Sequence, residues 1–209
     1  FLACVFSILM AVQSLTLPIT PPKKEGVKPW AFLESMKMLK AKNFAIFIAI
    51  TFVVSTELEF FYILTAPFLQ SDAIGVAPEN LPAVMTIAQF AEIFVMAFGL
   101  SWAIKRYGMR GTLAIGVVAW PIRYIIFAMG GPAWLVIASL ALHGFCYVFF
   151  FVAAFIYVDK VAPPDIRASA QSMIAIVALG LNLVLGNAGQ RTIAVDVGSR
   201  RFLQQLRDV

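Results

Sequence analysis

The stretch His143–Ser172, HGFCYVFFFVAAFIYVDKVAPPDIRASAQS, decides the fold. It begins with an aromatic, apolar run that is long enough, together with the residues before it, to cross a bilayer. A short charged segment with two adjacent prolines interrupts the helix, and another apolar run begins after it. A membrane span, a charged turn and a further span are typical of a polytopic helical membrane protein, so the stretch predicts an all-α fold.

The composition also indicates a membrane protein. Hydrophobic residues make up 61% of the 209 residues and charged residues 13%, and the mean hydropathy is +0.89. A soluble core of this size cannot bury so much apolar surface, so lipid must cover the excess. The net charge of +5 comes from basic residues in short loops between apolar runs. This distribution sets orientation in a membrane and does not indicate a nucleic-acid surface.

Five apolar runs are close to the length that spans a bilayer. They lie at about 43–69, 79–104, 111–129, 133–158 and 168–186. The loops that connect them alternate between acidic or neutral and basic. By the positive-inside rule this alternation predicts five consecutive membrane helices, with the basic loops on the cytoplasmic side.

Three other segments differ from these spans. Residues 1–17 are apolar but shorter than the roughly 20 residues of a crossing, so we expect the end of a truncated transmembrane helix. Residues 18–42 contain four prolines and six lysines and are predicted to be a cytoplasmic basic linker. Within it, residues 29–39 show the spacing of an amphipathic helix on the membrane surface. Residues 187–209 form an atypical polar tail, which is either a soluble end or the product of a truncated or frame-shifted gene.

The sequence carries no motif of a familiar enzyme. It lacks a G-x-S-x-G elbow, a P-loop and an H-E-x-x-H pair. Its single histidine and its two cysteines, Cys4 and Cys146, do not form a metal-binding or disulfide pattern. We therefore expect a protein that is not an enzyme and that uses no cofactor and no metal.

Polar residues inside the spans are the functional candidates, because an ionisable side chain at membrane depth costs at least ~2.5 kcal/mol. Counting about 1.5 Å per residue from the helix ends places several of them within about one turn of the middle of the bilayer. These residues are Glu57, Glu59, Glu92, Arg123 and His143. They form a polar layer rather than a scatter.

Helical spacing predicts which polar residues share a face. The pairs are Gln89 with Glu92, Glu59 with Tyr62, and His143 with Tyr147. Glu57 and Glu59 are two residues apart, so at most one of them faces a central cavity. Arg123 is the natural counter-charge for one of the three glutamates, and the sequence leaves open which one. Ordinary structural roles also remain open, because buried arginines often anchor helix packing and a lone histidine is often a satisfied core residue.

Several segments resemble the nucleoside:proton symporters of the major facilitator superfamily. They are DKVAPPDIRASAQS with HGFCYVFFF before it, LTAPFL after the first glutamate-bearing run, and KRYGMR between the second and third spans. The resemblance covers about residues 1–186. It implies a major-facilitator-type C-terminal six-helix bundle that is incomplete, with part of helix six and helices seven to eleven. It also implies a multi-pass protein of a bacterial-type inner membrane, whose N-terminal half lies outside this sequence.

The resemblance further implies roles for residues of the polar layer. The implied substrate-binding residues are Gln89, Glu92, Glu59, Tyr62, His143 and Tyr147. Four positions depart from the pattern of the family. Glu59 and Tyr62 stand where amides are expected, and His143 stands where a tyrosine is expected. Val148 stands where some relatives have an acid. These departures indicate a divergent member whose substrate preference is open.

The function implied by the resemblance is proton-coupled nucleoside transport by alternating access. Glu92 or Glu59 is the candidate for protonation, and Glu57 and Arg123 are candidates for a charge pair. The expected partners are a nucleoside, a proton, the lipid bilayer and the N-terminal half of the same transporter, with no nucleic acid. Two alternatives remain open. One is a sugar or oligosaccharide porter that uses Trp120 or Trp134, and the other is a non-transporting membrane protein or relic.

Overall fold

The computed structural model describes residues 2–18 and 30–180, and within these residues it is helical without a strand. Three helical stretches are long and apolar enough to cross a membrane: Lys42–Leu69, Leu81–Ala128 and Ala133–Val161. The all-α fold predicted for a membrane protein is therefore confirmed. The expected polar tail at 187–209 lies outside the described residues.

Two short helices precede the first long one. Helix α1 covers Leu2–Ser14, and its described side chains are exposed. Helix α2 covers Ala31–Lys37 and continues into a 3₁₀ turn, η1, at Met38–Lys40. Helix α2 packs against α9 (Arg167–Ala175), with Ser35 buried. Trp30, Leu33 and Met36, which lie in the expected amphipathic segment 29–39, are exposed.

The first two long stretches hold helices α3, α4 and α5. Helix α3 covers Lys42–Leu69. Helix α4 (Leu81–Phe94) continues through a π-helical turn, η2 (Val95–Gly99), into α5 (Leu100–Ala128). Gly108 breaks α5 with φ 70° and ψ 174°, a conformation that glycine adopts without a steric penalty. The break lies within KRYGMR, so the two spans expected at 79–104 and 111–129 meet at a single glycine bend.

The last long stretch is built from several helical segments. They are α6 (Ala133–Ser139), α7 (Leu142–Cys146), the π-helical turn η3 (Tyr147–Val152) and α8 (Ala153–Val161). The proline-containing turn follows, and then come α9 and the π-helical turn η4 (Ile176–Gly180). Asp159 joins the two sides of this turn, since its carboxylate lies 3.5 Å from Arg167 Nε and accepts a hydrogen bond from Gln171 at 3.4 Å.

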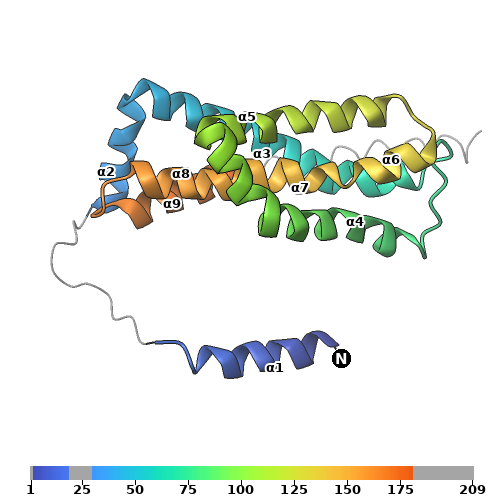
Figure 1. Ribbon diagram of the computed structural model, residues 1–209, viewed down its shortest axis with the longest axis horizontal. Coiled ribbons are helices and arrows are strands. Elements are labelled where there is room, and N and C mark those ends of the chain that lie inside the picture. Colours follow the sequence, from blue (N-terminus) through green and yellow to red (C-terminus); the bar gives the residue numbers. More distant parts are fainter. Residues whose placement is uncertain (1, 19–29, 181–209) are drawn as a thin grey trace, which may run out of the picture.

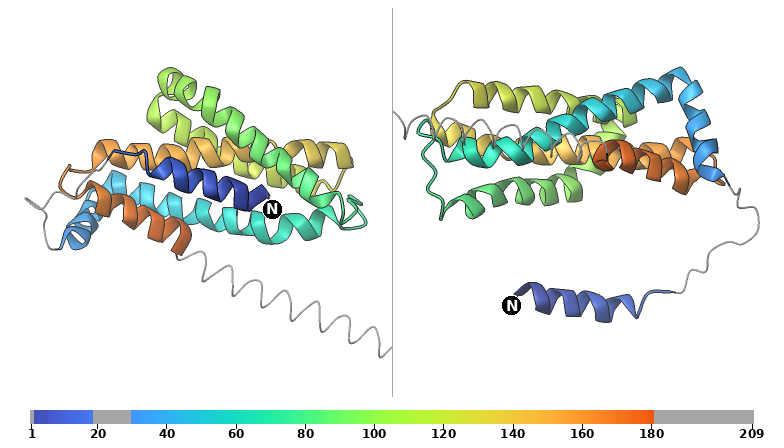
Figure 2. Two further views of the ribbon diagram at one scale, coloured as in Figure 1. Left: turned by 90° about the horizontal axis from the view of Figure 1, so that it is seen from below. Right: turned by 180° about the vertical axis from the view of Figure 1, so that it is seen from behind.

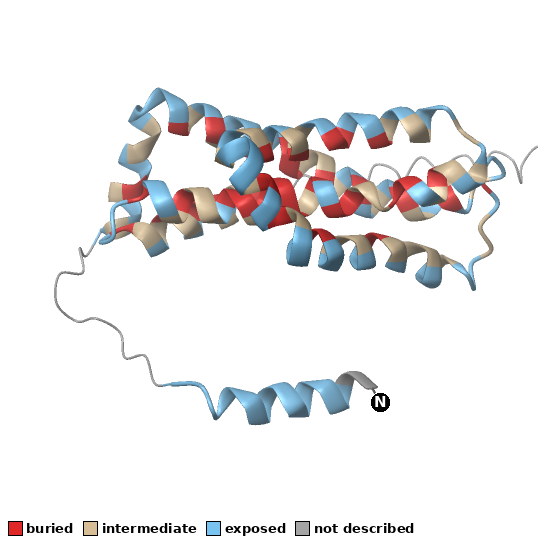
Figure 3. Ribbon diagram, in the orientation of Figure 1, coloured by how far each residue is buried: buried red, intermediate tan, exposed pale blue. Residues whose placement is uncertain are grey.

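The α6–α8 stretch forms the centre of the bundle (Figure 1). Its α7 and η3 segments pack against α4 and α5, and α3 packs against η4. Two further views show the same long helices side by side (Figure 2). Buried residues concentrate along α7 and η3 (Figure 3), and they include Phe149, Phe150 and Phe151. The polar layer predicted from the sequence therefore lies on or beside the most buried part of the bundle.

Candidate functional site

Three helices bring polar side chains of the predicted layer together. Tyr62 comes from α3, Glu92 from α4, and Tyr147 from the start of η3. The rings of Tyr62 and Tyr147 both lie against the His143 ring, at 6.2 Å and 5.8 Å between centroids. Glu92 is near enough to both tyrosines for its charge to act on their hydroxyl groups. Glu59 also interacts with Tyr62. The structure thus gathers four of the predicted site residues, although they are far apart in the sequence.

Gln89 and Glu92 lie on one side of α4, as their three-residue spacing predicts. Together with Ile93, Met96 and Ala97 they line a hollow of about 520 Å³. Gln89 is exposed and Glu92 is half-buried. An amide with two donors and an acceptor, next to a carboxylate, can hydrogen-bond a polar ligand in this hollow.

Gly144 sets the position of Glu92, and the sequence analysis missed it. A Cβ atom at residue 144 would lie 2.6 Å from both the backbone carbon and the oxygen of Ala91, and 2.9 Å from the Glu92 nitrogen. The backbones of α4 and α7 therefore touch at the point where Glu92 leaves its helix. The available signal was a small residue within a run of large aromatic ones, since small residues permit close approach of membrane helices.

Two π-helical turns border the site. The first, η2, begins three residues after Glu92, and the second, η3, begins at Tyr147. Such turns are rare and occur frequently at functional sites. Here η2 follows directly on α4, which carries Glu92, and η3 itself carries Tyr147, so both changes of helical register fall beside the site.

His143 is buried beneath the tyrosines, with 2% of its surface exposed. Its ring stacks on Phe61 at 4.4 Å between centroids and lies 6.2 Å from the Tyr62 ring and 5.8 Å from the Tyr147 ring. Arg123 Nη1 donates a hydrogen bond to His143 Nδ1 at 3.2 Å. Because a guanidinium can only donate, Nδ1 must accept, and the ring proton is carried by Nε2.

The surroundings of Arg123 differ from the expected ion pair with a glutamate. The residue has no exposed surface, and its guanidinium carbon lies 4.2 Å from the Phe61 ring centroid and 4.4 Å from that of Trp120. In the described part of the chain, no carboxylate comes within ion-pair distance of it. Aromatic faces attract a buried cation, so Phe61, Trp120 and His143 replace the expected carboxylate.

Glu57 and Glu59 lie on different sides of α3, as their two-residue spacing predicts. Glu57 interacts electrostatically with Arg123 and Tyr124, whereas Glu59 interacts with Tyr62. The Tyr124 hydroxyl also donates a hydrogen bond to the Glu57 backbone carbonyl at 2.7 Å. Glu57 therefore lies on the side of α3 that meets α5, and Glu59 lies on the side of the tyrosine cluster.

The two tryptophans considered for a sugar platform do not line the hollow beside Glu92. Trp120 is buried against the Arg123 guanidinium, and Trp134 is 68% exposed at the start of α6. Among the residues that the structure describes, no group of three or more His, Cys, Asp or Glu side chains could hold a metal ion.

A helical bundle with three stretches long and apolar enough to cross a membrane, and with ionisable side chains inside those stretches, is the architecture of an integral membrane protein. The sequence matches the family described as nucleoside H⁺ symporter over residues 1–197, and the chain belongs to that family. The resemblance noted in the sequence and the helical fold are thereby confirmed.

Individual relatives agree with this assignment. The chain is 36% identical over 188 residues to YegT of Escherichia coli (strain K12), covering 86% of this chain and 43% of YegT. It is 27% identical over 201 residues to the nucleoside permease NupG of the same organism, covering 89% of this chain and 48% of NupG. The crystal structure of the NupG D323A mutant matches with a TM-score of 0.67 and 26% identity, covering 87% of this chain and 48% of that one. The chain thus spans about half the length of these relatives.

Proposed function

We propose that this chain provides one half of a membrane transporter that moves nucleosides together with protons. Two observations carry the proposal: Tyr62 of α3 and Tyr147 of η3 meet at the His143 ring, and Glu92 of α4, whose charge acts on both tyrosines, lines a hollow together with Gln89. Ionisable residues at membrane depth are expensive and typically mark a substrate or proton pathway. Family membership supports the choice of nucleoside and proton as substrates.

Each side chain in the cluster has a chemical role in this proposal. Gln89 and Glu92 hydrogen-bond the polar edges of the base or the ribose, because both project into the same hollow. Tyr62 and Tyr147 offer aromatic faces for the base, with hydroxyl groups that can bond to it. The His143 ring packs against Tyr62 and Tyr147 and holds them in place. Its own orientation and tautomer are set by the hydrogen bond from Arg123. Glu92 or Glu59 carries the coupled proton.

Transport would proceed by alternating access, in which two helical bundles rock about a site near the middle of the membrane. A buried core next to the tyrosines consists of Arg123, Phe61, Trp120 and His143. Because these side chains are packed together, they would move with their own helical bundle as one rigid body. The tyrosine and glutamate side chains of the cluster remain partly exposed, as groups that meet a second bundle and a substrate must be.

The proposed setting is the bacterial inner membrane. Basic residues gather in the linker 18–42, around the Gly108 bend, and at Lys160 and Arg167. Basic loops lie on the cytoplasmic side by the positive-inside rule, so the linker is assigned to the cytoplasm. The partner bundle would be the other half of the same transporter.

Uptake of labelled uridine by a full-length transporter carrying this sequence tests the proposal. Loss of a charge-assisted hydrogen bond costs about 1.5–3 kcal/mol, so Glu92→Gln should lower uptake by at least about tenfold. The matched control is Glu79→Gln, which neutralises an exposed carboxylate in the loop before α4. Normal uptake by Glu92→Gln at the wild-type level of membrane expression would refute the assignment.

A further inference from the structure

Arg123 and His143 together fix one hydrogen-bond donor beside the two tyrosines. Arg123 Nη1 donates to His143 Nδ1 at 3.2 Å, so the ring proton of His143 is carried by Nε2. Two other donors of the guanidinium, Nε and Nη2, are buried without an acceptor among the described residues. Moving the ring proton to Nδ1 would set two donors against each other and deprive Nη1 of its acceptor as well. Unpaired buried donors are costly, so the tautomer is locked.

The Nε2–H group of His143 has no partner within the described part of the chain, where the bond from Arg123 is the hydrogen bond of this ring. The described side-chain nitrogens that are buried without a partner belong to Trp120, Arg123 and Arg167, and His143 Nε2 is not one of them. Nε2 therefore keeps a small accessible surface, within the 2% of His143 that is exposed. A donor on an otherwise buried residue can thus reach a ligand.

This small opening lies on the side of the tyrosines. The rings of Phe61 and Trp120 lie 4.4 Å and 6.2 Å from the His143 ring, and both residues are buried. They close off their sides of the imidazole. Tyr62 and Tyr147, which also lie against the ring, are partly exposed. The Nε2–H group therefore meets the space that the two tyrosines border.

We propose, on the basis of the nucleoside transport proposed above, that His143 Nε2 donates a hydrogen bond to an exocyclic carbonyl oxygen of the nucleobase and so selects oxo bases over amino bases. Uracil and hypoxanthine carry a carbonyl oxygen where cytosine and adenine carry an amino group. An amino group is itself a donor, so it leaves the locked N–H of His143 without a partner. Arg123 is a positioning residue, which acts on selectivity through His143 without touching the substrate.

The rings around this donor favour the base, rather than the ribose, as its partner. The His143 ring lies 6.2 Å from that of Tyr62 and 5.8 Å from that of Tyr147, between centroids. A base that stacks on either tyrosine brings its polar edge toward Nε2. The amide of Gln89 offers both a donor and an acceptor and can turn to suit either kind of base, whereas His143 cannot. The discrimination is therefore assigned to His143.

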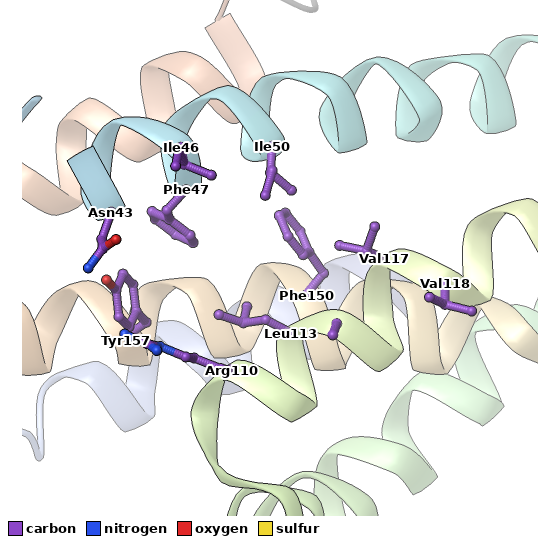
Figure 4. A pocket seen from close by; sticks show the side chains of 11 residues that line it. Asn43, Ile46, Phe47, Ile50, Arg110, Leu113, Val117, Val118, Phe150 and Tyr157 are labelled. Atoms are coloured by element: carbon purple, nitrogen blue, oxygen red, sulfur yellow. The ribbon is translucent and has the colours of Figure 1, made fainter.

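A larger groove on the bundle offers a base no comparable fixed donor. It has a volume of about 450 Å³ and lies between α3, α5 and the η3–α8 segment, and most of its lining is apolar (Figure 4). Its polar side chains are those of Asn43, Arg110 and Tyr157, of which the first two are exposed. Exposed side chains can turn, so they do not present a donor in one direction. Neither His143 nor its two tyrosine neighbours line this groove.

Competition measurements on a full-length transporter carrying this sequence test the proposal. Uptake of labelled uridine is inhibited with unlabelled uridine, cytidine, inosine or adenosine, and the half-inhibiting concentrations are compared within each oxo and amino pair. We expect uridine to compete about tenfold better than cytidine, and inosine about tenfold better than adenosine, because one donor is left unpaired by the amino base. These ratios do not depend on the amount of transporter in the membrane.

Three variants separate selectivity from stability. His143→Phe removes the donor, and Arg123→Gln replaces a group that only donates with an amide that also accepts, which frees the tautomer. Both should reduce each ratio to about twofold or less. A purely structural role of Arg123 would lower uptake and leave the ratios unchanged. The matched control, Tyr124→Phe, loses a hydrogen bond made by the next residue of α5 and should keep both ratios.

The wild-type ratios come first, so the proposal can fail without any variant. Equal inhibition by uridine and cytidine, and by inosine and adenosine, would overturn it. Ratios that persist in either His143→Phe or Arg123→Gln, or that collapse in Tyr124→Phe, would overturn it too. All of these results leave nucleoside transport itself standing. A transporter that takes up no labelled uridine would instead refute the proposed function, and this selectivity with it.

Discussion

Replacing Gly144 by alanine should disturb the site more than any other single added methyl group. The new Cβ atom would lie 2.6 Å from the backbone of Ala91, whereas ordinary contacts begin at 3.4 Å. Helix α4 must therefore move away from α7 by about 0.8 Å, because backbone atoms of two helices cannot yield as a flexible side chain does. Glu92 moves with its helix and away from Tyr147.

The size of the effect follows from this displacement. Overpacking a closely packed contact costs about 1–3 kcal/mol in stability. A shift of about 1 Å in a positioned group can cost about 100-fold in a rate that depends on it. We therefore expect Gly144→Ala to lower the melting temperature of the detergent-purified chain, and to lower labelled uridine uptake by a full-length transporter by about 10- to 100-fold.

The control adds carbon to the same span without a clash. Ala138 is exposed on α6, so Ala138→Val should leave both the melting temperature and uptake unchanged. Uptake is to be compared at equal amounts of transporter in the membrane, which separates loss of protein from loss of function. A Gly144→Ala variant with wild-type stability and uptake would refute the claim that this close approach positions Glu92.

Two further predictions concern the buried core behind the site. His143→Phe keeps a ring on Phe61 but removes the Nδ1 atom that accepts the hydrogen bond of Arg123 Nη1, so stability should fall by about 1–3 kcal/mol in thermal unfolding. No fall would show that the buried guanidinium does not depend on this hydrogen bond. Tyr124→Phe removes the hydrogen bond to the Glu57 backbone carbonyl and should lower the free energy of unfolding by about 0.5–1.5 kcal/mol in the same measurement. An unchanged melting temperature would mean that this hydrogen bond does not help to hold α3 against α5.

The membrane helices could be predicted because hydropathy reports directly on burial in lipid. The expected spans at 43–69 and 133–158 correspond to α3 and to the α6–α8 stretch. The connection between the second and third spans was harder to predict. Charge in KRYGMR marks a membrane interface, but only the backbone of Gly108 shows that the two helices are joined through a single non-helical residue.

The site was predictable within single helices and less so between them. Spacing correctly put Gln89 and Glu92 on one side of α4 and separated Glu57 from Glu59. The surroundings of Arg123 were not foreseen, because an argument from charge alone considers carboxylates and neglects aromatic faces. Which faces meet depends on how each helix is rotated in the bundle, and helical periodicity within one segment does not contain that information.

The central claim is that the cluster around Glu92 couples nucleoside movement to proton movement. Proteoliposomes with a full-length transporter carrying this sequence, in weakly buffered medium, allow external pH and labelled uridine uptake to be recorded together. The account predicts that uridine uptake is accompanied by a rise in external pH, and that Glu92→Gln abolishes the coupled signal while Glu79→Gln preserves it. Uridine uptake without proton movement, or a full signal in Glu92→Gln, would contradict the account.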